Sequence, residues 1–234
     1  MKKLLLLVGM ICATFAMSAQ EEKVVIDQEF SQGISAIQTA MDLAKLGYDT
    51  YSPTALIEAA RILAVTECTE TELEKEASEP VQVEEKDNAL SFNPSKLLAD
   101  AKEMAGKDKT LLALIKKTEK EVEESIKTKG SVQQRNAVDG PYYVEDRVYS
   151  NSSERYSCKF WSNQLAEVAI VGDGDTDLDL YIYDSNGNLI TKDDSTSGNA
   201  YCSWIPAWTD TFVIKVVNRG SVYNDFILVT NWFF

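Results

Sequence analysis

Hydrophobic periodicity divides the chain into an N-terminal part with helical spacing and a C-terminal part with strand spacing. Up to about residue 130, apolar residues recur every three or four positions, as on one face of an amphipathic helix. From Tyr142 onward they alternate with polar residues, as on the two faces of a strand. The pattern predicts an α+β chain in two domains, with a small helical bundle over 20–130 and an antiparallel β-sandwich over 142–234.

The helical part contains four segments with an apolar stripe. The first is predicted over Gln28–Tyr48, and the last runs from Asp108 to Gly130 and is expected to bury Ile126. The second and third open at Ser52-Pro53 and Asn93-Pro94, where a capping side chain precedes proline at the first helical position. Because these two openings are similar in pattern, a degenerate helical repeat is the alternative to a plain bundle.

The C-terminal part alternates short apolar-polar runs with clusters of Asn, Gly, Ser and Asp. These runs predict the strands Tyr142–Tyr149, Arg155–Trp161, Ala166–Val171, Asp177–Tyr183, Asn188–Thr191, Ala200–Trp204, Thr211–Asn218 and Tyr223–Thr230. Asn186-Gly187 favours a tight hairpin turn after the fourth strand. About eight strands of this length predict an antiparallel sandwich, jelly-roll-like in its connections.

Three further segments lie outside these elements. Residues 1–19 combine Lys2-Lys3, an apolar run and small residues, which is typical of a secretory signal peptide. Residues 66–88 are strongly acidic and are predicted as a short helix followed by a solvated loop, and the polar residues 131–141 as a linker. We therefore expect an exported protein, periplasmic or extracellular, with no membrane span in its mature form.

Charge and composition exclude several classes of function. The chain has 23 basic and 37 acidic residues, a net charge of −14, which argues against binding to nucleic acid. It contains no histidine, which removes Ser-His-Asp and Cys-His catalysis and histidine-ligated zinc. We therefore expect a protein that is not an enzyme. The alternative is a secreted glycosidase or peptidase that uses a carboxylate pair between the domains.

An acidic loop that precedes the fourth strand is the best candidate site. Its aspartates alternate with small residues, and calcium prefers six to eight oxygen ligands. A calcium-binding helix-loop-helix is excluded, because Leu178 stands at the required glycine and a strand follows the loop. The candidate calcium ligands at this sandwich edge are Asp173, Asp175, Asp177 and Asp179. In the alternative interpretation, these aspartates accept backbone N–H bonds in turns.

The cysteines and tryptophans each allow two interpretations. Cys12 leaves with the signal peptide, so Cys68, Cys158 and Cys202 can form at most one pair. Cys158 and Cys202 both lie in predicted strands and are the candidate disulfide; buried free thiols are the alternative. All four tryptophans lie in the C-terminal part, where they fill the sandwich core or form a stacking platform for sugars.

Three stretches of this part carry a resemblance to a known family. They are Asp177-Leu-Asp-Leu-Tyr-Ile-Tyr-Asp-Ser-Asn-Gly-Asn-Leu-Ile190, then Asp193-Asp194, then Thr209-Asp-Thr-Phe-Val-Ile-Lys-Val-Val-Asn218. Together they resemble the bacterial pre-peptidase C-terminal domain, over about residues 142–231. The resemblance implies a β-sandwich on an exported bacterial protein, often beside a secreted peptidase. Related collagen-binding domains of clostridial collagenases use calcium and bind matrix protein.

The chain departs from that family in two ways. Its other part is a small helical region instead of a peptidase, and Asp210 stands where the family usually has glycine. The resemblance therefore brings no activity with it. The function expected from the sequence is that of an exported, non-catalytic protein whose sandwich binds a protein or glycan partner, with calcium as the candidate cofactor.

Overall fold

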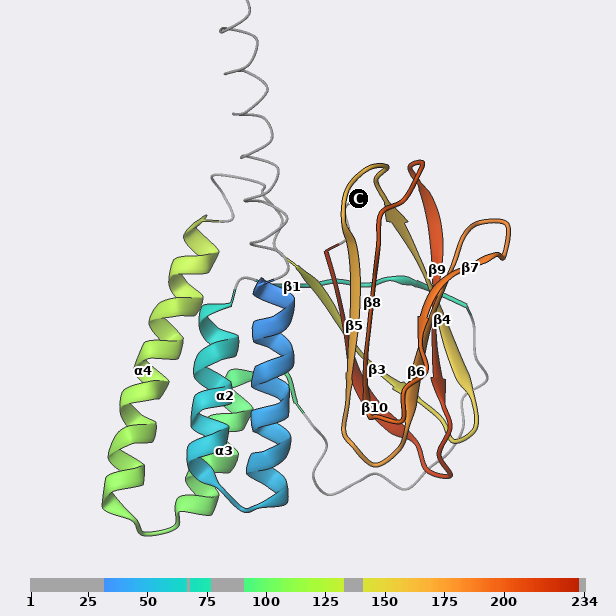
Figure 1. Cartoon of the computed structure of the whole chain (residues 1–234). Coiled ribbons are helices and arrows are strands. Elements are labelled where there is room, and N and C mark those ends of the chain that lie inside the picture. Colours follow the sequence, from blue (N-terminus) through green and yellow to red (C-terminus); the bar gives the residue numbers. More distant parts are fainter. Residues whose placement is uncertain (1–31, 67, 77–90, 133–140, 232–234) are drawn as a thin grey trace, which may run out of the picture.

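A computed structural model describes residues 32–66, 68–76, 91–132 and 141–231 (Figure 1). The predicted signal peptide, the later part of the acidic segment, most of the linker and Trp232 lie outside these residues. Four helices pack along one side of a two-sheet β-sandwich (Figure 1). None of the helices in the described ranges is long and apolar enough to cross a membrane.

Three of the four helices begin where the sequence predicted them, and the predicted start of the first, at Gln28, lies outside the described residues. The helices comprise a first helix over residues 32–49, α2 (Pro53–Val65), α3 (Pro94–Ala105) and α4 (Lys109–Val132). The Asn93 side chain caps α3 by accepting hydrogen bonds from the backbone N–H of Ser95 and of Lys96. Ser52 holds the same position before α2, but its side chain makes no capping bond and lies 3.1 Å from the Thr54 hydroxyl.

The predicted apolar stripes meet in one helical core, with a single exception among the residues predicted to be buried. Side chains such as Ile37, Leu56, Leu97 and Ile115 are fully buried there. Ile126 is 50% exposed, so its predicted burial was wrong. One turn earlier, Val122 is the last α4 residue of the helical core among the described side chains, so the packed part of this helix ends before Ile126.

All eight predicted strands are present, close to their predicted bounds. They are β3 (Tyr142–Val148), β4 (Ser153–Phe160), β5 (Ala166–Gly172), β6 (Leu178–Tyr183), β7 (Leu189–Asp193), β8 (Asn199–Trp204), β9 (Asp210–Asn218) and β10 (Asn224–Thr230). The predicted turn joins β6 to β7, and Gly187 adopts the left-handed conformation that such a turn requires, with φ of +81°.

Two additional strands, β1 (Thr69–Glu70) and β2 (Glu74–Lys75), lie in the acidic segment. β1 pairs in parallel with β3, and β2 pairs antiparallel with β4. The short helix predicted in this segment was therefore wrong over residues 69–75, because backbone pairing to two sheet edges replaces local helical hydrogen bonds. We call residues 69–75 the edge strap, since they cross from one sheet to the other (Figure 1).

The ten strands form two five-stranded sheets. The order is β1-β3-β10-β5-β8 in the sheet that faces the helices and β2-β4-β9-β6-β7 in the other. We call them the helix-facing sheet and the outer sheet. Apart from the parallel β1–β3 pair, neighbouring strands run antiparallel. The α+β class and the sandwich are thus confirmed, whereas the jelly-roll-like connectivity stays a prediction.

Strand β5 of the helix-facing sheet is buried on both of its faces. Every residue of β5 is buried, and all except Glu167 are apolar or glycine, as expected of a strand that is covered on both sides. Val168 and Ile170 face the outer sheet, while Ala169 and Val171 pack into the helical core together with Ile227 and Val229 of β10. The helices and the sandwich therefore share buried apolar surface, and the division into two domains stays a prediction.

Candidate functional site

The structure spreads the predicted calcium ligands over separate hydrogen-bond partners. The Asp173 carboxylate accepts the backbone N–H of Asp175 and of Asp225, each at 3.1 Å. Asp177 accepts the backbone N–H of Ser197 at 2.8 Å. These bonds are the turn contacts that the sequence allowed as the alternative to metal binding.

Asp179 belongs to a different surface from the loop aspartates. It is buried beside Arg219, whose Nε donates to its carboxylate at 2.6 Å. Across residues 32–66, 68–76, 91–132 and 141–231, no three side chains of His, Cys, Asp or Glu converge to hold a metal ion. As arranged, the four aspartates do not fit a calcium ion, and calcium binding stays a prediction of the sequence.

The acidic loop instead packs against the first helix. Gly174 has φ of +88°, and the Lys45 side chain lies so close that a Cβ at this position would clash with it. Next to it, the Asn199 side-chain amide donates to the Asp42 carboxylate at 2.9 Å. The loop therefore contributes to the junction between the helices and the sandwich.

The predicted disulfide is absent, because Cys158 and Cys202 are both free thiols. Cys158 lies on β4, second in the outer sheet, and Cys202 on β8, fifth in the helix-facing sheet. Three strand positions correspond to about 14 Å, whereas a disulfide requires Cα atoms within about 7 Å. Both side chains are buried, and burial raises the pKa of Cys202 to about 11.

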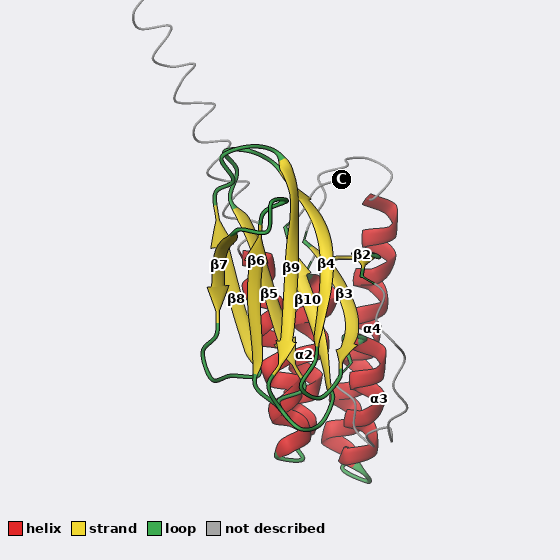
Figure 2. Ribbon diagram, turned by 90° about the vertical axis from the view of Figure 1, so that its right-hand side faces the viewer, coloured by secondary structure: helices red, strands yellow, loops and turns green. Residues whose placement is uncertain are grey.

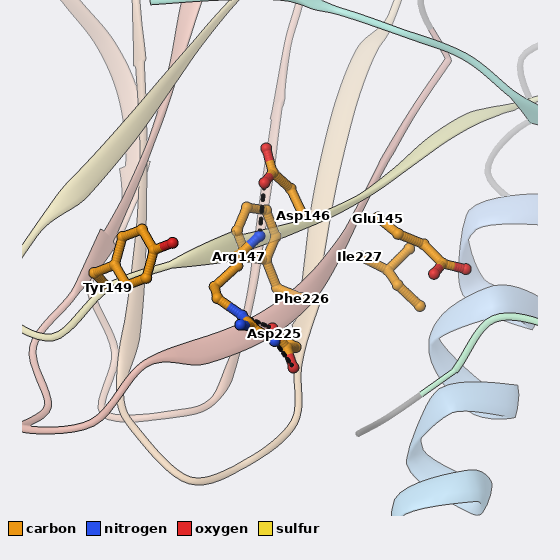
Figure 3. A pocket seen from close by; sticks show the side chains of 7 residues that line it. All are labelled: Glu145, Asp146, Arg147, Tyr149, Asp225, Phe226 and Ile227. Atoms are coloured by element: carbon orange, nitrogen blue, oxygen red, sulfur yellow. Dashed lines mark hydrogen bonds and ion pairs between the residues drawn. The ribbon is translucent and has the colours of Figure 1, made fainter. Parts of the chain in front are cut away.

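A depression of about 440 Å³ lies on the helix-facing sheet (Figure 3). Its lining residues are Glu145, Asp146, Arg147, Tyr149, Asp225, Phe226 and Ile227. Arg147 spans its floor with a bidentate pair to Asp225, Nε to Oδ1 at 2.6 Å and Nη2 to Oδ2 at 3.2 Å. The guanidinium also lies 4.1 Å from the centre of the Tyr223 ring. The Asp225 carboxylate is therefore already paired with the Arg147 guanidinium.

Glu145 is the second carboxylate of this depression. Loss of hydration raises the pKa of Glu145, the backbone N–H of Phe92 partly opposes the rise, and the charge of Glu70 adds to it. Cross-strand pairing sets Glu145 opposite Ile227 and Arg147 opposite Asp225. The two residues are therefore diagonal neighbours, and the Cα atoms of such positions lie about 7–8 Å apart. The sequence did not identify either residue, since their proximity depends on the pairing of β3 with β10.

The tryptophans divide between the core and one end of the sandwich. Trp204 packs against Phe160 and Phe212, with ring centres 4.7 and 5.5 Å away. Trp161 and Trp208 are 41% and 54% exposed, and Ile205 is 67% exposed. Trp204 thus fills the sandwich core, as one interpretation predicted, whereas Trp161 and Trp208 are exposed and their stacking on sugars stays a prediction. We call residues 161–165 and 205–209 the tryptophan loops.

Hydrogen bonds hold the tryptophan loops to each other. The backbone N–H of Asn163 donates to the Pro206 carbonyl at 2.8 Å, and that of Ser162 donates to the Thr209 hydroxyl at 3.0 Å. The two loops therefore present their exposed side chains from a joined, ordered backbone.

Asp210 anchors the same end of the sandwich. Hydrogen bonds from the Ser185 hydroxyl, the Thr211 backbone and the Trp208 side chain hold the pKa of Asp210 below its ordinary value. The residue that departs from the family pattern thus links the second tryptophan loop to the turn between β6 and β7. Glycine could not make these side-chain contacts.

Comparison with known proteins gave no relative by sequence: no family model and no curated protein matches. Three solved structures align at low similarity. A periplasmic inhibitor of g-type lysozyme from Aeromonas hydrophila has 7% identity and a TM-score of 0.32, and the alignment covers 40% of this chain and 86% of the inhibitor. A mitogen from Yersinia pseudotuberculosis has 12% identity and a TM-score of 0.30, covering 39% and 84%. A designed double-stranded β-helix has 11% identity and a TM-score of 0.25, covering 38% and 97%. Such low scores carry no functional argument.

Proposed function

We propose that this is an exported, non-catalytic binding protein whose sandwich binds a protein or glycan partner on the tryptophan loops. The observation that carries the proposal is the exposure of Trp161, Ile205 and Trp208 on two loops joined by hydrogen bonds. The resemblance of residues 142–231 to the pre-peptidase C-terminal domain agrees with a binding role. The sequence contains no histidine, which agrees with a non-catalytic role.

Large exposed aromatic side chains on an ordered backbone are better explained by a role in binding than by a contribution to the stability of the fold. A tryptophan left in water gives up stabilisation that burial would provide, whereas at an interface it supplies a large contact area and one N–H donor. Because the loops are already held together, less conformational entropy is lost when a partner binds. Tryptophan is also enriched among the residues that dominate binding energy at interfaces.

Binding assays with tryptophan variants test the proposal. We expect the full chain to bind at least one member of a panel of neutral glycans, anionic glycans and collagen, measured by titration calorimetry. Trp161→Ala and Trp208→Ala should each weaken that binding by about 2 kcal/mol, or roughly thirtyfold in Kd. Tyr51→Ala, which removes an exposed aromatic ring from the turn after the first helix, is the matched control. Equal binding by all three variants would contradict the proposed surface.

A secreted hydrolase is the second candidate, and the depression on the helix-facing sheet favours it. Glu145, with its raised pKa, has the property of a general acid, and Asp225 is a second carboxylate on the diagonal. Against this function, Asp225 is already held by Arg147 and is poorly placed to activate water. Turnover of chromogenic glycosides or a casein substrate that disappears in Glu145→Gln, but persists in Glu72→Gln, would establish this activity instead.

A further inference from the structure

The outer face of the outer sheet is not covered by the helices, which pack on the opposite side of the sandwich (Figure 2). Directly paired residues of antiparallel strands share a face, so the register shows what this face carries. Arg155 pairs with Lys215, Lys215 pairs with Tyr181, and Tyr181 pairs with Lys192. These four residues, which we call the basic row, cross β4, β9, β6 and β7 in one line.

Further cations and aromatic rings adjoin the basic row. Arg219 donates to the Tyr181 hydroxyl at 3.1 Å, and the Tyr181 and Tyr183 rings stack 6.5 Å apart. Along β4, the inward residues alternate with outward ones, so Lys159 and Trp161 share the face of Arg155. The Lys159 amine lies 5.6 Å from the centre of the Trp161 ring. The surface therefore continues from the basic row to the first tryptophan loop.

Folding does not require this arrangement of charge. Two cations directly opposite each other on neighbouring strands, as Arg155 and Lys215 are, destabilise a sheet. Within the described part of the chain, Lys215 makes no ion pair. Arg155 has only a distant partner, Glu76, with 3.8 Å between Nε and Oε2, and Lys192 pairs with Asp194. In a protein of net charge −14, an exposed row of cations around a tyrosine is matched by an anionic ligand.

We propose that the basic row binds an anionic polysaccharide, one that carries carboxylate or sulfate groups along a chain of sugars. The inference rests on the proposed binding function and names the class of its partner. A row across four strands is about 14 Å long, so it suits an extended chain lying across the sheet. Arg155, Lys215 and Lys192 meet the anionic groups, and the ring of Tyr181, between Lys215 and Lys192, stacks on a sugar face.

The spacing and extent of charge separate this ligand from other polyanions. Duplex DNA carries about one charge per 1.7 Å of its axis, which is far denser than three cations spread over about 14 Å. An anionic membrane would also bring its charge against the acidic surface around the row, because the whole chain has a net charge of −14. A polysaccharide with a charge on each sugar, or on alternate sugars, fits the separation of the cations along the row.

The test measures binding of the full chain to polygalacturonate, heparin and neutral dextran by titration calorimetry at two salt concentrations. We expect polygalacturonate or heparin to bind and dextran to bind at least tenfold more weakly. The variant Arg155→Gln with Lys215→Gln should weaken binding of the anionic polymer at least tenfold and reduce its salt dependence. Its unfolding midpoint should equal or exceed that of the parent chain, because a like-charge contact is removed.

The matched control is Lys120→Gln with Lys127→Gln, which removes the same charge from exposed positions of α4 and should leave binding within twofold. An equal loss in control and row variants would overturn the inference, as would tighter binding to single-stranded DNA or anionic vesicles. Binding lost in the tryptophan variants but kept in the row variant would overturn the basic row and leave the proposed function standing. Binding lost only in the row variant would place the ligand on the row and overturn the role of the tryptophan loops.

Discussion

Replacement of Lys75 tests how the edge strap is attached to the sandwich. The Lys75 amine lies 2.7 Å from an Asp146 carboxylate oxygen and 3.2 Å from one of Glu154. The Tyr156 hydroxyl donates to the same Asp146 oxygen at 2.7 Å. Lysine is thus the cation shared by two carboxylates where the strap meets β3 and β4.

The expected loss of unfolding free energy in Lys75→Ala follows from the burial of Glu154. The Glu154 side chain is 3% exposed, whereas that of Lys75 is 28% exposed. In Lys75→Ala the Glu154 carboxylate stays buried without its cation, and removing one partner of a buried pair costs about 3–5 kcal/mol. Because the lysine itself is partly hydrated, we expect a loss of about 3 kcal/mol in the free energy of unfolding. The double variant Lys75→Met with Glu154→Gln should recover at least half of it, since the fully buried Glu154 charge is removed and the unpaired Asp146 carboxylate is partly exposed.

Urea unfolding of the full chain at pH 7 measures these differences, and the cycle of Lys75→Met, Glu154→Gln and their double variant isolates the coupling between Lys75 and Glu154. The pH dependence provides a second check. Burial alone would lower the pKa of Lys75, but the hydrogen bond and charge of Asp146, with the charge of Glu154, raise it above its ordinary value. A raised pKa means that the contribution is complete below the unfolded value, about 10.4, and is lost as pH rises through the folded one.

A loss below 1 kcal/mol in Lys75→Ala would refute this reasoning. It would show that water or another cation replaces the lysine amine at Glu154, and that the strap is held by its backbone hydrogen bonds alone. A difference between parent and variant that does not narrow as the pH rises above 10 would also contradict the assigned role.

Three further predictions concern local structure and the acidic loop. Asn93→Ala should lower the free energy of unfolding by about 1 kcal/mol, whereas Ser52→Ala, which removes no capping bond, should change it by much less in the same urea titration. Gly187→Ala, in open space at φ of +81°, should cost about 1 kcal/mol, and Gly174→Ala should cost more because Lys45 must also move; equal costs would contradict the packing of Lys45. The thermal midpoint of the full chain should be the same in calcium and in EDTA, because the loop carboxylates already accept backbone hydrogen bonds; a calcium-dependent rise would place an ion there.

The elements of this fold were predictable wherever their signal was local. The apolar spacing of the helices, the proline at two helix starts and the strict alternation in the sandwich identify each element without its neighbours. The edge strap carried a local signal that its acidic surroundings masked. Glu70, Glu72 and Glu74 alternate with less exposed residues, which is the period of a strand. Where these strands pair is not a local property, because it depends on the unpaired backbone groups at the edges of β3 and β4.

The candidate sites depend on the register in which neighbouring strands pair, and the sequence does not specify that register. The alternation along β4 and β9 predicts that Arg155 and Lys215 each face outward, but only the pairing of the two strands sets one opposite the other. The same holds for Glu145 and Asp225 on β3 and β10. The disulfide prediction failed for this reason as well, since both cysteines face the interior but from distant strand positions.

The order of the strands has a consequence for biosynthesis. β10, the last of the described strands, lies between β3 and β5, and β9, the strand before it, lies between β4 and β6. Each sheet therefore lacks its central strand until the chain has been made past residue 210. A nascent chain that ends before residue 210 can form its helices but can close neither sheet, and its apolar strands stay exposed. Folding of the sandwich must then await the synthesis of β9 and β10, which is compatible with passage through a membrane in an unfolded state.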